Sequence, residues 1–567
     1  MAAHRAAPTA GAVRLLTVTL VCLLVTTALL TPALAASSGF EPTTAADGGT
    51  GMVQGQTTAG SANGTIHTDV EDSIESATGT IEVVLRLEEA TIPADATETE
   101  AERLLEDHAA ETQESLLEHV ADTPGVSVES EFWLTNAVLL EVDADRIDLE
   151  TLELLAAADP VEAVHENFEL SVPEEPTVDG TNSTAEMPVD GDETSATTRL
   201  TTPGIAQLNA PAVWDSYDTR GDGVRVAVLD TGVDADHPSI DLHTEDPSDP
   251  TYPGGWAEFD AAGERVEGST PHDSGTHGTH VSGTVAGNAA SGAQIGVAPD
   301  AELLHGLVLH ETSGSFAQII AGMEWALEED ADVISMSLGS TGTQSALIDP
   351  VQNAVDSGAV VVAAIGNDGE ETSNSPGNVY EAISVGAVHA DGTVASFSGG
   401  ETIDRSDWTH EQASWPSSYV VPDVVAHGVA VFSAVPGGGY QPMPGTSMAT
   451  PHVSGTIALM LSAEPDATAE EISTALYGTT WKPDGADADT MDTRYGHGIV
   501  DAKAATDALV DTREAIDTGS ADGATETESK TTAPYSQLFA AGVSVIVVLV
   551  AAVTLLAARS VSRETEH

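Results

Sequence analysis

The feature that most restricts the fold is a regular alternation of short apolar runs and helical stretches between residues 199 and about 510. The runs are rich in Val, Ile, Leu and Ala, and they lie at 224–229, 303–309, 333–336, 359–365 and 382–388. Helical patterns, such as those at 315–328 and 347–356, separate them. Continuous apolar runs are typical of parallel strands that are buried on both faces. We therefore predict an α/β domain with a mostly parallel sheet.

Ligands of such sheets bind beyond the carboxyl ends of the strands, and the first candidate residue lies there. Asp230 directly follows the run 224–229 and opens the sequence Asp-Thr-Gly-Val-Asp. A carboxylate that a glycine turn holds at a strand end can orient a neighbouring base. A turn-forming aspartate would explain Asp230 equally well if it stood alone.

The second candidate is His277, in the sequence Asp-Ser-Gly-Thr-His-Gly-Thr-His-Val-Ser-Gly-Thr. Gly275 and Gly278 permit close approach of the backbone. A metal site is an alternative, because His277 and His280 are three residues apart on one helical face. Zinc would need a third ligand and usually a Glu base on the same helix, and no Glu lies between these histidines. The pattern therefore favours a base over a metal ligand.

The third candidate is Ser447, in the sequence Gly-Thr-Ser-Met-Ala-Thr-Pro-His-Val-Ser-Gly, which runs into an apolar helical stretch at 456–461. A serine at a helix N-terminus has an exposed hydroxyl above the positive end of the helix dipole. An ordinary helix-capping serine has the same position. Ser447 alone would not distinguish the two.

The three blocks together resemble the signatures of the subtilisin-like serine proteases, in which the acid, histidine and serine occur in this order. A fourth block, Ala-Ala-Ile-Gly-Asn-Asp-Gly at 363–369, resembles the segment that carries the family's oxyanion asparagine. The resemblance extends over about 201–510. With the acidic composition it suggests a halolysin-like member of haloarchaeal type. It implies a three-layer α/β domain and a reaction that needs no cofactor.

The resemblance also implies roles for individual residues. Ser447 would attack the scissile carbonyl, His277 would transfer the proton, and Asp230 would orient the imidazole. Asn367 would hydrogen-bond the oxyanion. The expected substrate-binding residues are Ser337, Leu338 and Gly339 along the substrate backbone, and Ala364 and Gly366 at the pocket for the residue before the cut. His280 and His452 would be structural.

One departure from the family concerns calcium. Family members often have an Asp after the His-Pro pair, whereas Ser239 follows His237-Pro238 here, although Asp241 is near. A structural calcium ion therefore stays possible without being established. The stretch 241–271 is acidic and contains Gly and Pro, so we expect a surface loop, in which calcium ligands cannot be distinguished from general acidity.

A smaller unit precedes this domain. Residues 78–171 have the pattern β-α-β-β-α-β, with strands at 81–87, 126–133, 137–142 and 161–170 and helices at 98–120 and 148–157. This is the order of a ferredoxin-like α+β domain. Its place before the larger domain resembles an inhibitor-type propeptide, a partner within the same chain. We expect a flexible lead-in at 36–77 and an acidic linker at 172–198.

The two ends of the chain predict export and anchoring. Residues 1–35 combine Arg5 and Arg14 with an apolar run at 15–30 and a small-residue cleavage site, as a signal peptide does. The only cysteine, Cys22, lies in this segment, so a mature chain without disulfides is expected.

At the other end, a polar linker at 511–537 leads to 21 uncharged residues at 538–558, enough for a transmembrane helix. Arg559 and Arg563 predict that the tail at 559–567 is cytoplasmic. The enzyme would then lie on the outer face of the cell membrane, or be released by clipping.

The charge balance is strongly acidic, with 91 Asp and Glu against 17 Lys and Arg and a formal net charge of -74. This excludes nucleic acid as a natural partner, since a polyanion would be repelled. The acids are spread through the globular segments rather than gathered in a tail. Because salt screens such repulsion, we predict a protein that is most stable in concentrated salt.

These observations predict a secreted, surface-anchored serine endopeptidase, made as a self-processing precursor and acting on protein or peptide substrates. Two alternatives stay open at this point. One is a surface binding or adhesion protein on an inactive protease fold. The other is a processing protease with one or a few substrates.

Overall fold

The computed structural model describes residues 64–93, 96–176, 200–244, 254–409, 412–486 and 490–517. The predicted signal peptide at 1–35 and the predicted spanning segment at 538–558 lie outside these residues. Within the described part of the chain, every helix is too short or too polar to cross a membrane. The predicted polar linker begins later than position 511, because the last described helix, α12 (Ala502–Asp517), continues to residue 517.

The larger domain (residues 200–517) is organised around one seven-stranded sheet with the order β18-β15-β13-β11-β7-β9-β8. Every neighbouring pair in this sheet is parallel. The strands are β7 (Arg225–Asp230), β8 (Trp256–Glu258), β9 (Glu302–Leu307), β11 (Val333–Met336), β13 (Val360–Ala364), β15 (Ile383–Val388) and β18 (Val424–His427). The prediction of an α/β fold with a mostly parallel sheet is confirmed.

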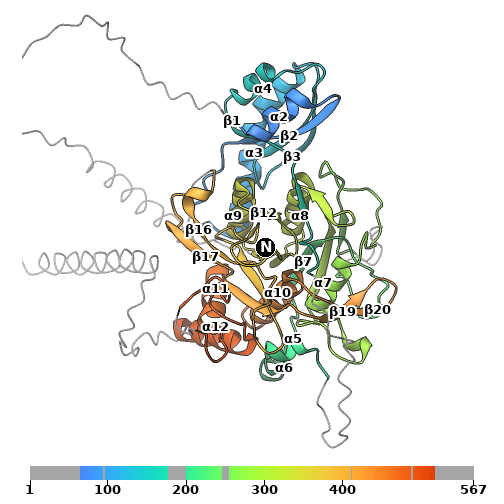
Figure 1. Ribbon diagram of the computed structural model, residues 1–567, viewed down its shortest axis with the longest axis vertical. Helices are drawn as coiled ribbons and strands as arrows, with labels where there is room; N and C mark the ends of the chain where they lie inside the picture. The colour runs from blue at the N-terminus through green and yellow to red at the C-terminus, as the bar shows by residue number, and fades with distance from the viewer. Residues whose placement is uncertain are drawn as a thin grey trace, which may run out of the picture. The chain divides into compact units, whose positions relative to one another are not determined.

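Helices cover both faces of the sheet and make the domain three-layered (Figure 1). Val226 and Val228 of β7 belong to one apolar cluster with residues of α7 (His277–Ala286) and α10 (Thr446–Ala463). Ala227 and Leu229 belong to the opposite cluster, with residues of α8 (Phe316–Glu328) and α9 (Ile348–Asp356). This is the alternation of side chains that a strand produces.

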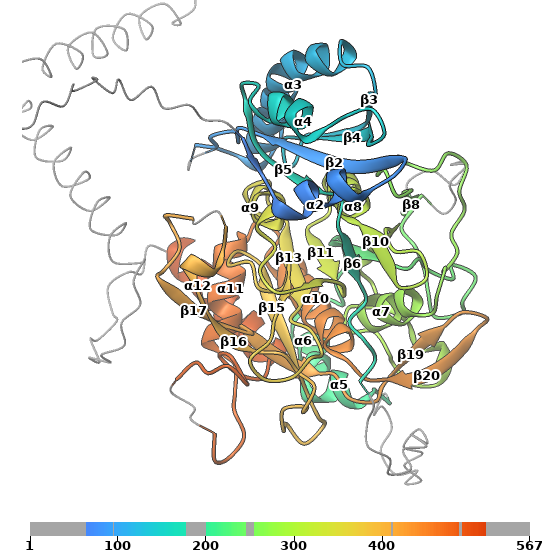
Figure 2. The same cartoon turned by 45° about the horizontal axis from the view of Figure 1, so that its top comes forward.

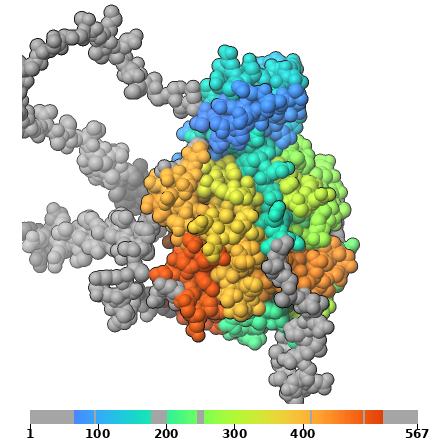
Figure 3. All heavy atoms as spheres, in the orientation of Figure 1, coloured from blue at the N-terminus to red at the C-terminus, as the bar shows by residue number. Residues whose placement is uncertain are grey.

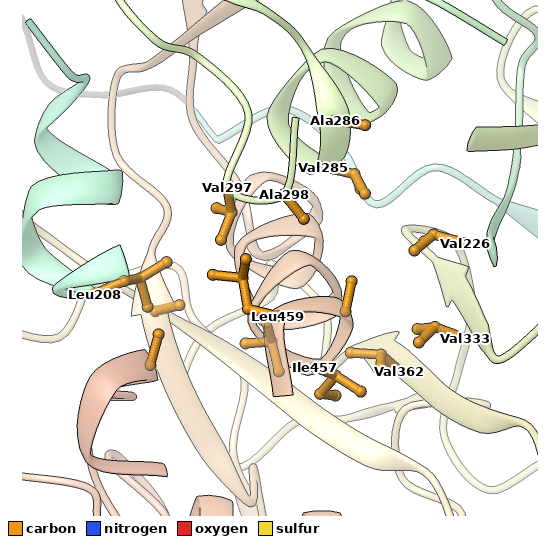
Figure 4. Packing of buried hydrophobic residues seen from close by; sticks show 14 of the residues in the cluster. Leu208, Val226, Val285, Ala286, Val297, Ala298, Val333, Val362, Ile457 and Leu459 are labelled. Atoms are coloured by element: carbon orange, nitrogen blue, oxygen red, sulfur yellow. The ribbon is translucent and has the colours of Figure 1, made fainter. Parts of the chain in front are cut away.

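Figure 4 shows the first of these clusters from close by, with Val226, Val333 and Val362 from three neighbouring strands and Ile457 and Leu459 from α10. All five side chains are buried. Burying one such side chain contributes about 1.5–3 kcal/mol, so this layer holds α10 firmly against the sheet.

Shorter elements complete the larger domain. The helices are α5 (Pro203–Gln207), α6 (Ala210–Tyr217) and α11 (Ala469–Gly478), and the short strands are β10 (Ser313–Ser315), β12 (Ser340–Thr341), β14 (Asn374–Ser375), β16 (Glu401–Asp404), β17 (Ser418–Val421), β19 (Val431–Val435) and β20 (Gly439–Met443).

The expectation of a surface loop at 241–271 was wrong for part of that stretch. Trp256–Glu258 forms β8, the edge strand of the main sheet, and pairs in parallel with β9. Trp256 is fully buried and Phe259 is 4% exposed. These two aromatic residues supply apolar surface that the acidic composition of the stretch concealed.

The N-terminal domain (residues 64–171) has the element order expected from the sequence. Its members are β2 (Thr80–Leu87), α3 (Glu98–Ala121), β3 (Val126–Phe132), β4 (Ala137–Asp143), α4 (Leu149–Ala156) and β5 (Val161–Glu166). The antiparallel strands are arranged β5-β2-β4-β3, so the first and third strands of the pattern are central, as in a ferredoxin-like sheet. The last predicted strand is divided, because β6 (Glu169–Ser171) leaves this sheet.

The flexible lead-in is shorter than expected. Residues 65–76 form β1 (Thr65–Ile66), which pairs in parallel with β5, and the helix α2 (Thr68–Ser76). Val70 and Ile74 of α2 are buried in the core of the N-terminal domain. These two residues are four apart and share one helix face, whereas the polar residues around them give the stretch the composition of a linker.

The N-terminal domain packs on α8 and α9 (Figure 1). Arg86 of β2 and Asp349 of α9 form a buried ion pair. Glu324 of α8 accepts hydrogen bonds from the backbone N–H groups of Trp133 (2.6 Å) and Leu134 (2.8 Å), in the turn between β3 and β4. One apolar cluster also contains residues of both domains, Val84 and Leu105 among them.

Candidate active site

Asp230 and His277 meet where β7 ends and α7 begins. The Nδ1 atom of His277 lies 2.8 and 3.0 Å from the two carboxylate oxygens of Asp230 and hydrogen-bonds to them. Asp230 is fully buried and His277 is 7% exposed. The other ring nitrogen, Nε2, has no hydrogen-bond partner among the described residues, so it is free to accept a proton.

The turn after Asp230 requires glycine at position 232. Gly232 has a φ of +106°, and a Cβ atom there would lie 2.1 Å from the carbonyl oxygen of His272. The hydroxyl of Thr231 accepts the N–H of Gly278 (2.9 Å) and donates to Asp273 (2.8 Å). These contacts fasten the start of α7 to the end of β7, which explains why the two sequence blocks are so rich in Gly and Thr.

The pKa of the His277 imidazole lies above its ordinary value of 6.5. Burial of the ring lowers this pKa, but the charge of Asp230 and its hydrogen bond raise it by more. Asp273 and Glu175 add smaller contributions in the same direction. The site therefore stabilises an imidazolium, which a proton-transferring base needs.

Ser447 is the second residue of α10 and is 2% exposed. Its hydroxyl donates a hydrogen bond to the carbonyl oxygen of Ser337, with the oxygens 3.4 Å apart. The described residues contain no hydrogen bond between this hydroxyl and His277 Nε2. Nucleophile–base hydrogen bonds are often long before substrate is in place. The structure thus joins Asp230 to His277 directly and places Ser447 on α10, which packs against α7.

Asn367 is oriented by the same helix that carries Ser447. Its side-chain oxygen accepts hydrogen bonds from the N–H (2.9 Å) and the hydroxyl (3.0 Å) of Thr446. The amide nitrogen is thereby left to donate to the carbonyl oxygen of Glu174 (3.1 Å). An amide donor aimed at a backbone carbonyl is the arrangement that stabilises an oxyanion.

Two of the five predicted substrate-binding residues, Leu338 and Gly339, lie beside an extended stretch of the chain itself. Gly339 exchanges two backbone hydrogen bonds with Ser171, both 2.9 Å long. Leu338 is buried in the same apolar cluster as Leu170. Figure 2 shows β6 between β10 and β11, and Figure 3 shows the stretch that follows it, in teal, on the surface of the larger domain.

Ala364 is the last residue of β13, and Gly366 follows two positions later with a φ of +108°. Both therefore lie beside Asn367 at the carboxyl end of the strand. A Cβ atom at Gly366 would approach the Asn374 side chain to 2.8 Å. Their assignment to the pocket for the residue before the cut stays a prediction.

Strand β6 lies in a groove between Gly339 on one side and β10 on the other. The sequence did not reveal the β10 side of this groove. β10 pairs antiparallel with β6, and the Val172 N–H donates to the carbonyl oxygen of Thr312 (2.9 Å). The sequence also gave no role to His305, whose Nε2 accepts the N–H of Gly232 (3.1 Å) below the Asp230 turn. Backbone pairing leaves almost no signature in sequence, since any residue type except proline can provide it.

His280 and His452 have other partners. His280 bonds through Nε2 to the Val431 carbonyl oxygen (2.9 Å), and His452 bonds through Nδ1 to that of Met448 (2.8 Å). Both rings are fully buried. Burial lowers the pKa of His280 to about 3 and that of His452 to about 4, so both stay neutral, as structural histidines do.

The described residues contain no group of three or more His, Cys, Asp or Glu side chains that is arranged to hold a metal ion. His277 and His280 in particular bond to different partners, which disfavours the zinc alternative. Ser239, at the position where calcium ligation was in doubt, shares a hydrogen bond with the Tyr440 hydroxyl (2.8 Å).

Comparison with known proteins identifies the family of the larger domain. Residues 221–498 match the model of the Subtilase family, Peptidase_S8. The chain is 38% identical to subtilisin E of Bacillus subtilis (strain 168), over 53% of this chain and 70% of that protein. It is 38% identical to a subtilisin of Bacillus pumilus over 53% and 97%, and 36% identical to an intracellular serine protease of Paenibacillus polymyxa over 49% and 79%. The chain therefore belongs to the subtilase family and is a serine endopeptidase of the subtilisin type.

Proposed function

We propose that this chain is the precursor of an exported endopeptidase in which Ser447 is the nucleophile, His277 the general base and Asp230 the residue that orients it. One observation carries the assignment. The hydrogen bonds of Asp230 leave His277 Nε2 as the free ring nitrogen, while Asn367 directs its amide at a backbone carbonyl that lies across the same site. This combination serves peptide hydrolysis and has no evident structural purpose.

The chemistry follows from these positions. The Ser447 hydroxyl attacks the carbonyl carbon of the substrate as its proton passes to His277 Nε2. Asp230 holds the imidazole in the tautomer with a proton on Nδ1 and stabilises the imidazolium that forms. The Asn367 amide donates to the developing oxyanion. Collapse of the tetrahedral intermediate leaves an acyl-enzyme, which water then hydrolyses.

The N-terminal domain acts as an inhibitor of this site and as an aid to its folding. Two observations support this role. Residues 169–172 occupy the groove between Gly339 and β10 as a substrate strand would. The domain also buries Glu324 and Asp349 of the larger domain, which would otherwise face water. A substrate therefore has to displace the chain's own residues.

Export, anchoring and adaptation to salt complete the proposal. Support comes from the sequence alone: the signal-peptide pattern at 1–35, the uncharged stretch at 538–558 and the formal net charge of -74. A halolysin-like enzyme on the outer membrane face fits all three. Specificity for one or a few substrates is compatible with the same site, and cleavage of a peptide library distinguishes broad from narrow selection.

The variant Ser447→Ala tests the proposal. The full chain is produced in multimolar KCl, and its processing and its digestion of casein are followed by mass spectrometry and gel analysis. We expect an unprocessed precursor without casein digestion, because the nucleophile is missing. Ser473→Ala, on the surface of α11, is the matched control and should process and digest as the unaltered chain does. Processing by Ser447→Ala would refute the assignment.

A further inference from the structure

The last strand of the N-terminal domain, β6, and the residues that follow it up to 176 form the tail, residues 169–176. Its first part is held by backbone bonds on two sides. Ser171 pairs with Gly339 on one side, and β6 pairs with β10 on the other. The Val172 N–H reaches Thr312. Such a strand can slide by one residue only by breaking all of these bonds, so its register in the groove is fixed.

The backbone of the tail then reaches Asn367, the candidate oxyanion donor. The carbonyl oxygen of Glu174 accepts the Asn367 amide at 3.1 Å. The orientation of the Asn367 side chain is fixed, because its oxygen accepts two hydrogen bonds from Thr446. The carboxylate of the next residue, Glu175, contributes to the raised pKa of His277. The Glu174 carbonyl thus lies at the oxyanion donor, and the following residue carries its charge near the base.

We infer that the Glu174–Glu175 bond is the first one that the enzyme cuts in its own chain. This inference rests on the proposed function, since it assigns the substrate of that same site. It places the maturation cut between two acidic residues. The cut then falls near the start of the acidic linker that the sequence predicts at 172–198, and it leaves residues 175–198 on the side of the larger domain.

The burial of the tail shows which side chains the groove selects. Leu170 is fully buried among apolar residues of the larger domain, and Pro173 is also buried. Glu174 and Glu175 are exposed to solvent. The substrate class that follows is an extended peptide with an apolar residue at the place of Leu170, and with acidic residues tolerated on both sides of the cut.

The cut needs no reactant other than water. A bond forms between Ser447 Oγ and the Glu174 carbonyl carbon, while the hydroxyl proton passes to His277 Nε2. The bond from that carbon to the Glu175 nitrogen breaks, and His277 returns the proton to the leaving amine. Water hydrolyses the ester, which leaves a carboxylate on Glu174 and a new amino terminus on Glu175.

The test is intact-mass analysis of the full chain during its maturation in multimolar KCl. The first products expected are a fragment that ends at Glu174 and one that begins at Glu175. The variant Glu175→Pro should abolish this cut, because a prolyl nitrogen is a hindered leaving group, whereas Glu175→Gln should retain it. A first cut at another bond, or an undiminished cut in Glu175→Pro, would overturn the inference.

A synthetic peptide of residues 168–177 provides a second measurement that does not depend on folding of a variant. The processed enzyme should cut it between the two glutamates, and a peptide with Leu170→Asp should be cut far more slowly. Failure of the proposed function looks different. If the proposed function is wrong, the Ser447→Ala chain would still cut the same bond. If only the inference is wrong, cutting would depend on Ser447 but would occur at another bond.

Discussion

At the scale of single residues, the site is defined by how each polar atom is committed. The Asp230 carboxylate hydrogen-bonds to Nδ1 of His277, which leaves Nε2 of that ring for proton transfer. The side-chain oxygen of Asn367 accepts hydrogen bonds from Thr446, which leaves the amide nitrogen to donate. Burial makes these commitments strong, since a hydrogen bond in a low-dielectric site is worth more than one in water. The reactive groups are therefore oriented before substrate arrives.

The pH dependence of activity should follow His277. The imidazole must be neutral to accept the Ser447 proton, and its pKa is raised above 6.5, so kcat/KM should rise with pH through that raised value. The measurement is a pH profile of peptide hydrolysis at constant high salt.

The variant Asp230→Asn should reduce kcat by about 10⁴-fold, because an amide stabilises the wrong imidazole tautomer. The same change should lower the pKa of His277, since the negative charge that raises it is removed. Activity that persists below pH 6.5 in the unaltered enzyme, or an active Asp230→Asn, would contradict this account of the base.

At the scale of elements, the site depends on the close approach of α7 to the strand end that carries Asp230. Gly278 is the contact point: a Cβ atom there would lie 2.1 Å from the Gly232 carbonyl oxygen. That oxygen belongs to the backbone of a turn, so it cannot move aside easily. The glycine after His277 is therefore required by packing.

Gly278→Ala should separate α7 from the turn, with loss of activity and a stability decrease of about 1–3 kcal/mol, the usual range for overpacking. Gly478→Ala is the matched control, since nothing lies within 4 Å of its added methyl group. Hydrolysis rates and denaturant midpoints measure both effects. Equal behaviour of the two variants would mean that the contact at Gly278 is unimportant.

The strength of the contact between the N-terminal domain and the helices α8 and α9 should depend on pH. Glu324 of α8 lies in this contact, and so does Glu89 of the N-terminal domain, which accepts a hydrogen bond from Asn353 of α9. Burial raises the pKa of Glu324 to about 8, and the N–H groups of Trp133 and Leu134 offset only part of that rise. Burial likewise raises the pKa of Glu89 to about 8, with Asp349 adding to the rise and Arg86 opposing it. When the domain leaves, both carboxyl groups return towards the ordinary value of 4.5. The bound state therefore holds more protons between about pH 4.5 and 8, and binding weakens as pH rises through that window.

The cleaved but undissociated complex allows this to be measured. Its inhibition should relax faster at higher pH, and Glu324→Gln should flatten this dependence, because the amide oxygen can accept both N–H groups without a charge. Glu324→Ala should weaken binding at every pH, since it leaves two buried N–H groups unpaired. Inhibition that is independent of pH in the unaltered complex would argue against proton-linked release.

At the scale of the whole molecule, the excess of 74 negative charges dominates. Mutual repulsion of like charges opposes compaction, and salt shortens its range to about 3 Å at 1 M. We expect the unfolding midpoint to rise steadily as KCl increases from dilute to multimolar concentration. A midpoint that does not change with salt would exclude the proposed adaptation.

Over the whole molecule, the sequence predicted the reactive residues but not all of the contacts around them. The blocks around Asp230, His277 and Ser447 were found because each combines a reactive residue with the glycines and hydroxyls that position it. The groove edge at β10, the Glu324 contact and the place of Glu174 were not found, because they depend on backbone groups that meet across the fold. β8 and α2 were missed because Trp256 and Val70 lie within stretches of polar composition.

The most direct test of the central claim is labelling with a serine-reactive phosphonate, followed by mass spectrometry of the adduct. We expect a single adduct on Ser447 that forms in the processed enzyme and is slow in the precursor, where the tail occupies the groove. In His277→Ala the adduct should be absent, because the hydroxyl loses its base. An adduct on another residue, or equal labelling of Ser447 in His277→Ala, would contradict the claim that these residues form one catalytic unit.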